Sequence, residues 1–202
     1  MKIFNYIKTT SLKALATLSL CSLLVCGEIG CTTSWITEVE QLEPVAVSAV
    51  TTVISIIALL NGAGVSAADI NTVTGISNQI NTDLNTALKL VQSYNSANAT
   101  TTIQQINAAL ASAEALLPQI LTDLHVTDAA TVAKVTALVN LIQSQISAWE
   151  ALIPALSGAK VSRVSVSAVL SKHEFKRQFN EILKSKTGSV ALDHATAQVH
   201  KI

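Results

Sequence analysis

The chain has 202 residues, 50% of them hydrophobic and only 3% aromatic, which excludes a wholly disordered protein and allows one main domain with an aliphatic core. Its formal net charge is zero, but residues 31–157 carry two cations and nine anions, whereas residues 158–202 carry eight cations and three anions. The sequence therefore describes an acidic body with a basic tail.

Residues 1–30 have the pattern of an export signal. Lys2, Lys8 and Lys13 precede the uncharged apolar run ALATLSLCSLLVC. A basic segment followed by an apolar run of this length is typical of a signal peptide, and the run is shorter than the roughly 20 residues needed to span a bilayer. We therefore predict that residues 1–30 are cleaved and take no part in the fold.

Two cleavage sites fit the end of this leader. The sequence ending in Gly30-Cys31 resembles the end of the bacterial lipobox, in which a lipid is attached to the cysteine that becomes the first residue. The resemblance covers only the leader, and Glu28 stands where the lipobox has Leu or another apolar residue. Ordinary cleavage after Gly27, with Val25 two positions before it, would instead leave Glu28 first.

The cysteine count favours the lipidated form. Cleavage before Cys31 leaves a single cysteine at the mature N-terminus, so no internal disulfide can form, and a soluble exported chain would carry a free thiol. We predict a lipoprotein modified at Cys31, with a secreted soluble protein as the alternative. Thr32 is not acidic, and the resemblance then implies an outer-membrane anchor in the cell envelope, with the protein facing the periplasm or the surface.

The mature chain is expected to begin with residues 31–43, a short acidic spacer or a helical prelude, followed by a helix with Pro44 in its first turn. Residues 45–60 are apolar nearly all round, so we interpret them as the most buried helix of the body, with a membrane-inserting segment or a strand as alternatives. Trp35 in the spacer is a candidate contact with the lipid interface, or it packs under one end of the bundle.

Three further helices are predicted from the spacing of apolar residues. These residues recur at alternating intervals of three and four over residues 103–124 and 132–153, and more loosely over residues 70–91. This spacing is typical of helices packed along nearly parallel or antiparallel axes, and short connections force neighbours to run antiparallel. We therefore predict an all-α fold, an antiparallel up-down four-helix bundle over residues 44–155, with a kink at Pro118.

Polar residues mark where two of these helices begin. Ser66 followed by Asp69 resembles an N-cap with an acidic residue in the first turn, and Thr127 with Asp128 supplies a similar start for the later helix.

A linker over residues 156–170 leads to a basic helical tail, residues 171–202. Ser171 with Glu174 matches the S-x-x-E capping box and starts a short amphipathic helix. Two aromatic residues on one face of this helix and three cations on the rest are candidate contacts with a membrane or a partner: Phe175, Phe179, Lys172, Lys176 and Arg177.

The alternative for this helix is intramolecular. Its two Phe side chains would dock on the bundle while its cations face the acidic body. Nucleic acid is not predicted as a partner, because the basic patch is small and an exported protein seldom meets nucleic acid. An exposed apolar edge of the bundle would also allow self-association.

No motif predicts catalysis, a metal or a cofactor. Nucleophile signatures, phosphate-binding glycine loops and zinc-ligand spacings are absent from the sequence. His125 lies at a predicted turn, where capping or solvent exposure explains it. The carboxylates within the predicted helices are isolated along the chain, so no acid–base pair is expected. These carboxylates are Asp83, Glu114 and Glu150, and the histidines of the tail are His173, His194 and His200.

The sequence therefore predicts an exported, lipid-anchored helical-bundle protein with a non-catalytic interaction or scaffolding role at the cell envelope. The alternative is a membrane-active protein that inserts residues 45–60 into a bilayer. An enzyme would need a site assembled across helices, which a motif search does not detect.

Overall fold

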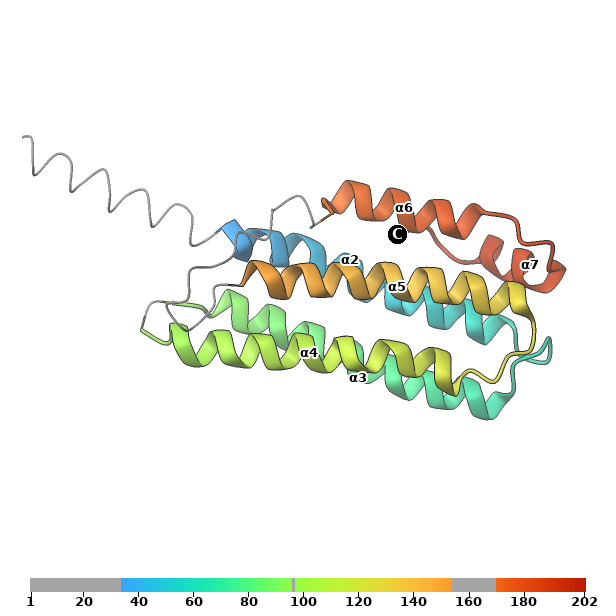
Figure 1. The fold of residues 1–202 in the computed structure, drawn as a ribbon, viewed down its shortest axis with the longest axis horizontal. Coiled ribbons are helices and arrows are strands. Elements are labelled where there is room, and N and C mark those ends of the chain that lie inside the picture. Colours follow the sequence, from blue (N-terminus) through green and yellow to red (C-terminus); the bar gives the residue numbers. More distant parts are fainter. Residues whose placement is uncertain (1–33, 96, 154–169) are drawn as a thin grey trace, which may run out of the picture. The chain divides into compact units, whose positions relative to one another are not determined.

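The computed structural model describes residues 34–95, 97–153 and 170–202 (Figure 1). These residues form six α-helices and no strand, which confirms the all-α class. The predicted signal peptide, Cys31 and the predicted linker up to residue 169 lie outside the described residues. The helices are α2 (Ser34–Leu59), α3 (Ala67–Gln92), α4 (Ala99–Asp123), α5 (Ala129–Leu152), α6 (Lys172–Lys184) and α7 (Val190–Gln198).

Contacts divide the chain into two compact units, Met1–Thr37 and Glu38–Ile202, and the packing described here is that of the second unit. Within it, α3 contacts α4, α4 contacts α5, α5 contacts α6, and α6 contacts α7. Figure 1 shows α3, α4 and α5 running lengthwise beside one another. This order of contacts is compatible with the predicted four-helix bundle.

The segment before Pro44 is helical. α2 starts at Ser34, which agrees with the helical alternative for residues 34–43 and places Pro44 inside the helix instead of in its first turn. A proline inside a helix removes one backbone hydrogen bond. Leu42 and Val45, on either side of Pro44, are 1% and 4% exposed, so burial of the apolar face offsets that loss.

The inward side chains of α2 belong to the core. Val50, Val53 and Ile57 are fully buried, whereas the outward positions include Thr51 and Ser55. The hydroxyls of Thr51 and Ser55 donate to carbonyl oxygens one turn earlier in α2, each at 2.9 Å. By length and composition the segment Trp35–Leu59 resembles a membrane-crossing helix, but 56% of its most apolar stretch is buried inside the structure. The burial favours the core interpretation of residues 45–60.

The predicted apolar spacing is confirmed in α3, α4 and α5. Each helix buries the side chains at its three-and-four intervals, among them Ile80, Ile106 and Ile142, none of which is exposed. Two predicted positions are exceptions: Val132 is 40% exposed, and Ile70 is half-buried. Helix α4 continues through Pro118 to Asp123.

The predicted helix starts are also confirmed. Ser66 caps α3 by accepting from the Asp69 N–H at 3.1 Å, and Asp128 caps α5 by accepting from the Thr131 N–H at 3.1 Å. These side chains satisfy donors that the first helical turn leaves unpaired.

Candidate functional site

The apolar face of α6 is buried within the second unit. Phe175 and Phe179, one helical turn apart, are 1% and 0% exposed, and their rings stack with centroids 6.1 Å apart. Leu183, one turn further, is 4% exposed and continues this face. The burial favours docking of both Phe side chains on the protein itself over their exposure to a membrane or partner.

Two buried polar side chains of α5 bind the two ends of α6. Near its C-terminal end, the Lys134 ammonium group donates to the carbonyl oxygens of Leu183 at 3.0 Å and Ser185 at 2.5 Å. At the other end, the Gln145 amide donates to the Leu170 carbonyl and accepts from the Leu170 N–H, each at 3.2 Å. Lys134 and Gln145 are 4% and 2% exposed. Because the later α5 residue holds the start of α6, the two helices run antiparallel.

Lys134 acts as a C-terminal cap that comes from another helix. The last carbonyls of an α-helix lack intrahelical donors and carry partial negative charge. Burial lowers the pKa of Lys134, while the charge of Asp193 on α7 acts in the opposite direction. The same ammonium group therefore links α5, the end of α6 and the first turn of α7.

The ion pairs of α6 lie within the helix itself. Arg177 pairs with Glu174 and Glu181 on its own helix, with Arg177 Nη1 lying 2.6 Å from Glu181 Oε1. The bonds from Arg177, and then that from Gln178, lower the pKa of Glu174 to about 2. Within the described ranges no ion pair joins α6 to α2, α3, α4 or α5. The expectation that these cations face the acidic body stays a prediction, because the ion pairs of Arg177 are made within α6.

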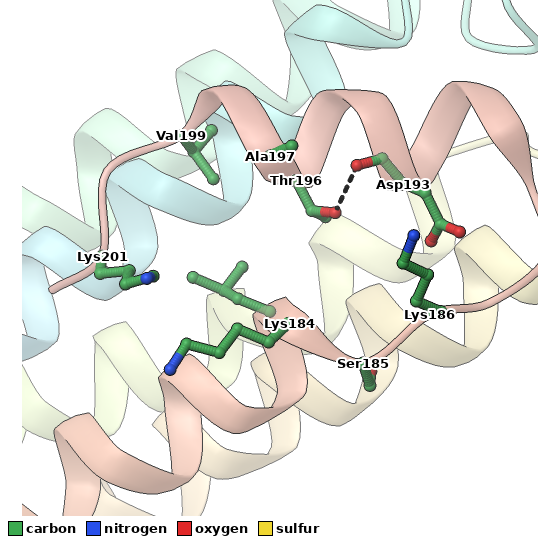
Figure 2. Close-up of a pocket in the computed structure, with 9 residues that line it drawn as sticks. Lys184, Ser185, Lys186, Asp193, Thr196, Ala197, Val199 and Lys201 are labelled. Carbon is green, nitrogen blue, oxygen red and sulfur yellow. Dashed lines mark hydrogen bonds between the residues drawn. The ribbon is translucent and has the colours of Figure 1, made fainter.

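A pocket of about 320 Å³ lies between the end of α6 and α7 (Figure 2). Three lysines line it together with the Asp193 carboxylate and several small or apolar side chains. In Figure 2 the lysines approach the pocket from three segments: the end of α6, the turn before α7 and the last residues of the chain. The lining is Leu183, Lys184, Ser185, Lys186, Asp193, Thr196, Ala197, Val199 and Lys201.

In the connection before α5, His125 binds an acidic side chain in the first turn of α3. His125 Nδ1 lies 2.9 Å from Asp69 Oδ1, and Ser66 Oγ donates to Asp69 Oδ2 at 2.8 Å. These bonds raise the pKa of His125 and lower that of Asp69. The Ser66 hydroxyl donates its hydrogen bond to Asp69 and not to the His125 imidazole. His125 is therefore not placed to accept the Ser66 proton and activate this hydroxyl as a nucleophile.

A carboxyl pair forms where the sequence indicated isolated residues. Glu114 on α4 and Glu150 on α5 interact, and Ser147 Oγ donates to Glu114 Oε1 at 2.5 Å. Burial, followed by the charge and hydrogen bond of Glu114, raises the pKa of Glu150 to about 7. The expectation that these carboxylates are isolated is therefore wrong for this pair, because packing of α4 on α5 joins residues distant in sequence.

The remaining predicted site residues have different environments. Cys31 lies outside the described residues, and Trp35, in the first turn of α2, is 3% exposed. Lys172 is exposed and Lys176 is half-buried, and neither forms an ion pair with the described part of the chain. No group of three His, Cys, Asp or Glu side chains within the described ranges is placed to hold a metal ion.

Sequence reasoning missed Lys134, Gln145 and the three lysines of the pocket. Lys134 and Gln145 each stand beside a position of the apolar stripe of α5, which is the one local sign that they face a neighbour. The sequence does not indicate what Lys134 and Gln145 bind, because their partners are backbone atoms, which every residue has. Comparison of the chain with protein-family models, with curated proteins and with solved structures found no match.

Proposed function

We propose that this protein is an exported lipoprotein, anchored at Cys31, whose antiparallel up-down four-helix bundle of α2 to α5 serves a non-catalytic interaction or scaffolding role at the cell envelope. The basic amphipathic helix α6 lies along α5 and forms part of the interaction surface. The anchor directs the protein to the outer membrane, facing the periplasm or the cell surface. The leader with its basic start, apolar run and Gly30-Cys31 end supports the anchor.

The observation that carries the interaction role is the fixation of α6 at both ends. Lys134 and Gln145 bind the backbone on either side of this helix, and its aromatic face is buried. The exposed side of α6 therefore presents Lys172 and Lys184 from a fixed backbone. A surface ordered before it meets a partner loses less conformational entropy on binding, which favours a binding role.

Cell fractionation tests the anchor. The protein is produced in a Gram-negative host as wild type, as Cys31→Ala, and as the control Cys26→Ala, which removes another cysteine of the leader. The proposal expects wild type and Cys26→Ala in the membrane fraction and Cys31→Ala in the soluble fraction. Equal distribution of all three forms would instead support the secreted soluble alternative.

The second candidate function is membrane insertion of residues 45–60, which the length and apolarity of Trp35–Leu59 favour. Insertion would have to withdraw core side chains such as Val53 and Ile57, which are fully buried. The two functions differ in a vesicle leakage assay. The scaffolding proposal expects no release of an encapsulated dye over a range of pH and lipid composition, whereas release that depends on residues 45–60 would support the alternative.

A further inference from the structure

The pocket beside α7 is built on backbone that is fixed on every side. Lys184 ends α6, and the carbonyls on both sides of it, those of Leu183 and Ser185, accept from Lys134. At the far side of the pocket, the Asn180 side chain donates to the Ile202 carbonyl at 3.1 Å and accepts from the Ile202 N–H at 3.2 Å. This two-point bond holds the segment that carries the third lysine of the pocket.

The turn before α7 is fixed as well. Asp193 Oδ1 accepts from the Thr187 N–H at 3.0 Å and from the Thr187 hydroxyl at 3.1 Å. The hydrogen bond from the Thr187 backbone N–H is the largest cause of the lowered pKa of Asp193. The Asp193 carboxylate is therefore ionised, and its hydrogen bonds are made to the turn that precedes α7. Lys186 immediately precedes Thr187, so the bonds of Thr187 also fix the backbone of Lys186.

The pocket carries an excess of positive charge. Lys184, Lys186 and Lys201 are exposed, and none of them forms an ion pair with any described residue. Asp193 is the one acidic residue of the lining. Three cations and one anion around a concave surface attract a negative group, and the concave shape concentrates the field.

Apolar side chains complete the lining. Leu183, Ala197 and Val199 line the pocket together with the lysines, whose aliphatic stems add further apolar surface. In Figure 2 the side chain of Lys201 extends toward the space between α6 and α7. Such a site suits a ligand with a negative head and an apolar body, because the two parts of the lining match the two parts of the ligand.

We propose that this pocket binds the phosphate head of an anionic amphiphile. The phosphate lies at the ammonium groups of Lys184 and Lys201, which are on one side of the pocket in Figure 2, and Lys186 adds positive charge from the other side, near Asp193. The apolar part of the ligand lies against Leu183 and Val199. A phosphate has enough oxygens to accept from several ammonium groups, and lysine binds phosphate as a point charge. The inference deepens the proposed function by naming the chemistry of a partner, but it does not depend on the anchor at Cys31.

Titration of the complete chain with dihexanoylphosphatidylglycerol, kept below its micelle concentration, tests this site. We expect saturable binding that the triple variant Lys184→Gln, Lys186→Gln, Lys201→Gln weakens about a hundredfold, because each lysine near an anionic lipid contributes roughly fivefold. Glutamine keeps most of the aliphatic stem, and the three side chains are exposed, so helical content by circular dichroism is expected to stay unchanged.

The matched control removes one charge outside the pocket with Lys89→Gln, at an exposed site of α3, and is compared with the single pocket variant Lys201→Gln. We expect this control to bind within about twofold of wild type at physiological ionic strength, because exposed charges beyond a Debye length are largely screened. An equal loss in the control, an unchanged affinity in the pocket variant, or equally tight binding of zwitterionic dihexanoylphosphatidylcholine would each overturn the proposal.

Two further probes identify the source of the phosphate. Vesicle binding that requires the three pocket lysines assigns the bilayer as the source, and binding of the monomeric lipid alone assigns a free lipid; both agree with the site. If inorganic phosphate binds as tightly as the lipid, the apolar lining contributes nothing and the assignment of an amphiphile is wrong. Lipid binding by a chain that lacks the Cys31 anchor would separate this site from the anchoring proposal.

Discussion

The ammonium group of Lys134 lies 3.0 Å from the carbonyl oxygen of Leu183, so a side chain of α5 closes the end of α6. This bond joins residues far apart in the chain and fixes the C-terminal end of α6 on α5. Without it, the carbonyls of Leu183 and Ser185 would lose a buried charged donor. One lysine in the middle of the sequence therefore holds the C-terminal end of α6, while Gln145 and the buried Phe side chains hold the rest of the helix.

Replacement of this lysine is expected to loosen the tail. Lys134→Met keeps an unbranched apolar chain but removes the donor, and we expect the free energy of unfolding to fall by about 2–3 kcal/mol, since hydrogen bonds to charged groups are worth about this much. Amide hydrogen exchange at the end of α6 is expected to speed up more than exchange in α3. Lys89→Met, on the exposed side of α3, is the control. Equal exchange at the end of α6 in Lys134→Met and wild type would show that the bond does not hold the tail.

Truncation of an aromatic side chain of α6 tests its burial directly. Phe179 is not exposed, so Phe179→Ala is expected to lower the free energy of unfolding by about 3–5 kcal/mol in the absence of any membrane. Urea denaturation measures the change. Val190→Ala, at a site that is 85% exposed, is expected to change stability by less than about 0.5 kcal/mol. If Phe179→Ala is as stable as wild type, Phe179 does not stabilise the fold, and the result supports a contact of this side chain with a membrane or a partner.

The carboxyl pair on α4 and α5 gives stability a definite pH dependence. Burial and Glu114 raise the pKa of Glu150 to about 7 in the folded protein, above the ordinary value of 4.5. Between these values the folded state binds more protons than the unfolded state, so this contribution is fully present below about pH 4.5 and is lost as the pH rises through 7.

The variant Glu150→Gln removes this dependence. We expect it to be more stable than wild type at pH 8 by about 1–2 kcal/mol, discounted for partial exposure, and nearly equal to wild type at pH 4. Thermal unfolding across this pH range measures the difference. Glu40→Gln, at an exposed site of α2, is the control and is expected to change little. A constant difference between Glu150→Gln and wild type at all pH values would show that Glu150 does not titrate in this range.

The bond between His125 and Asp69 is expected to appear in the titration of the imidazole. The hydrogen bond and charge of Asp69 raise the pKa of His125, so Asp69→Asn is expected to lower that pKa toward the ordinary value of 6.5. The stability that this raised pKa contributes is present below pH 6.5 and is lost as the pH rises through the folded value. NMR of the His125 ring measures the pKa, with Asp83→Asn as a control on the same helix. An identical titration in wild type and Asp69→Asn would contradict the observed contact.

The sequence allowed the helices of the body to be predicted because their signals are local. Apolar side chains at three-and-four intervals determine which face is buried, and residues such as Ser66 and Asp128 bind the first turn that follows them. The sequence left the start of α2 open between a spacer and a helical prelude, because Pro44 is typical of a first helical turn and tertiary burial overrides that preference.

The site residues depend on contacts that leave no local signal. The pairing of Glu114 with Glu150 follows from the register of α4 on α5, which a single sequence does not contain. The bonds of Lys134 are made to backbone oxygens, so no partner residue type reveals them. The pocket lysines are spread over the end of α6, a turn and the end of the chain, and they meet because α7 folds back toward α6.

The intact mass of the mature protein, purified from a bacterial membrane fraction, shows whether a lipid at Cys31 anchors it to the envelope. We expect a chain that starts at Cys31 and carries added acyl mass, and loss of this form in Cys31→Ala. An unmodified chain that starts at Glu28 would contradict the anchor and identify a secreted soluble protein.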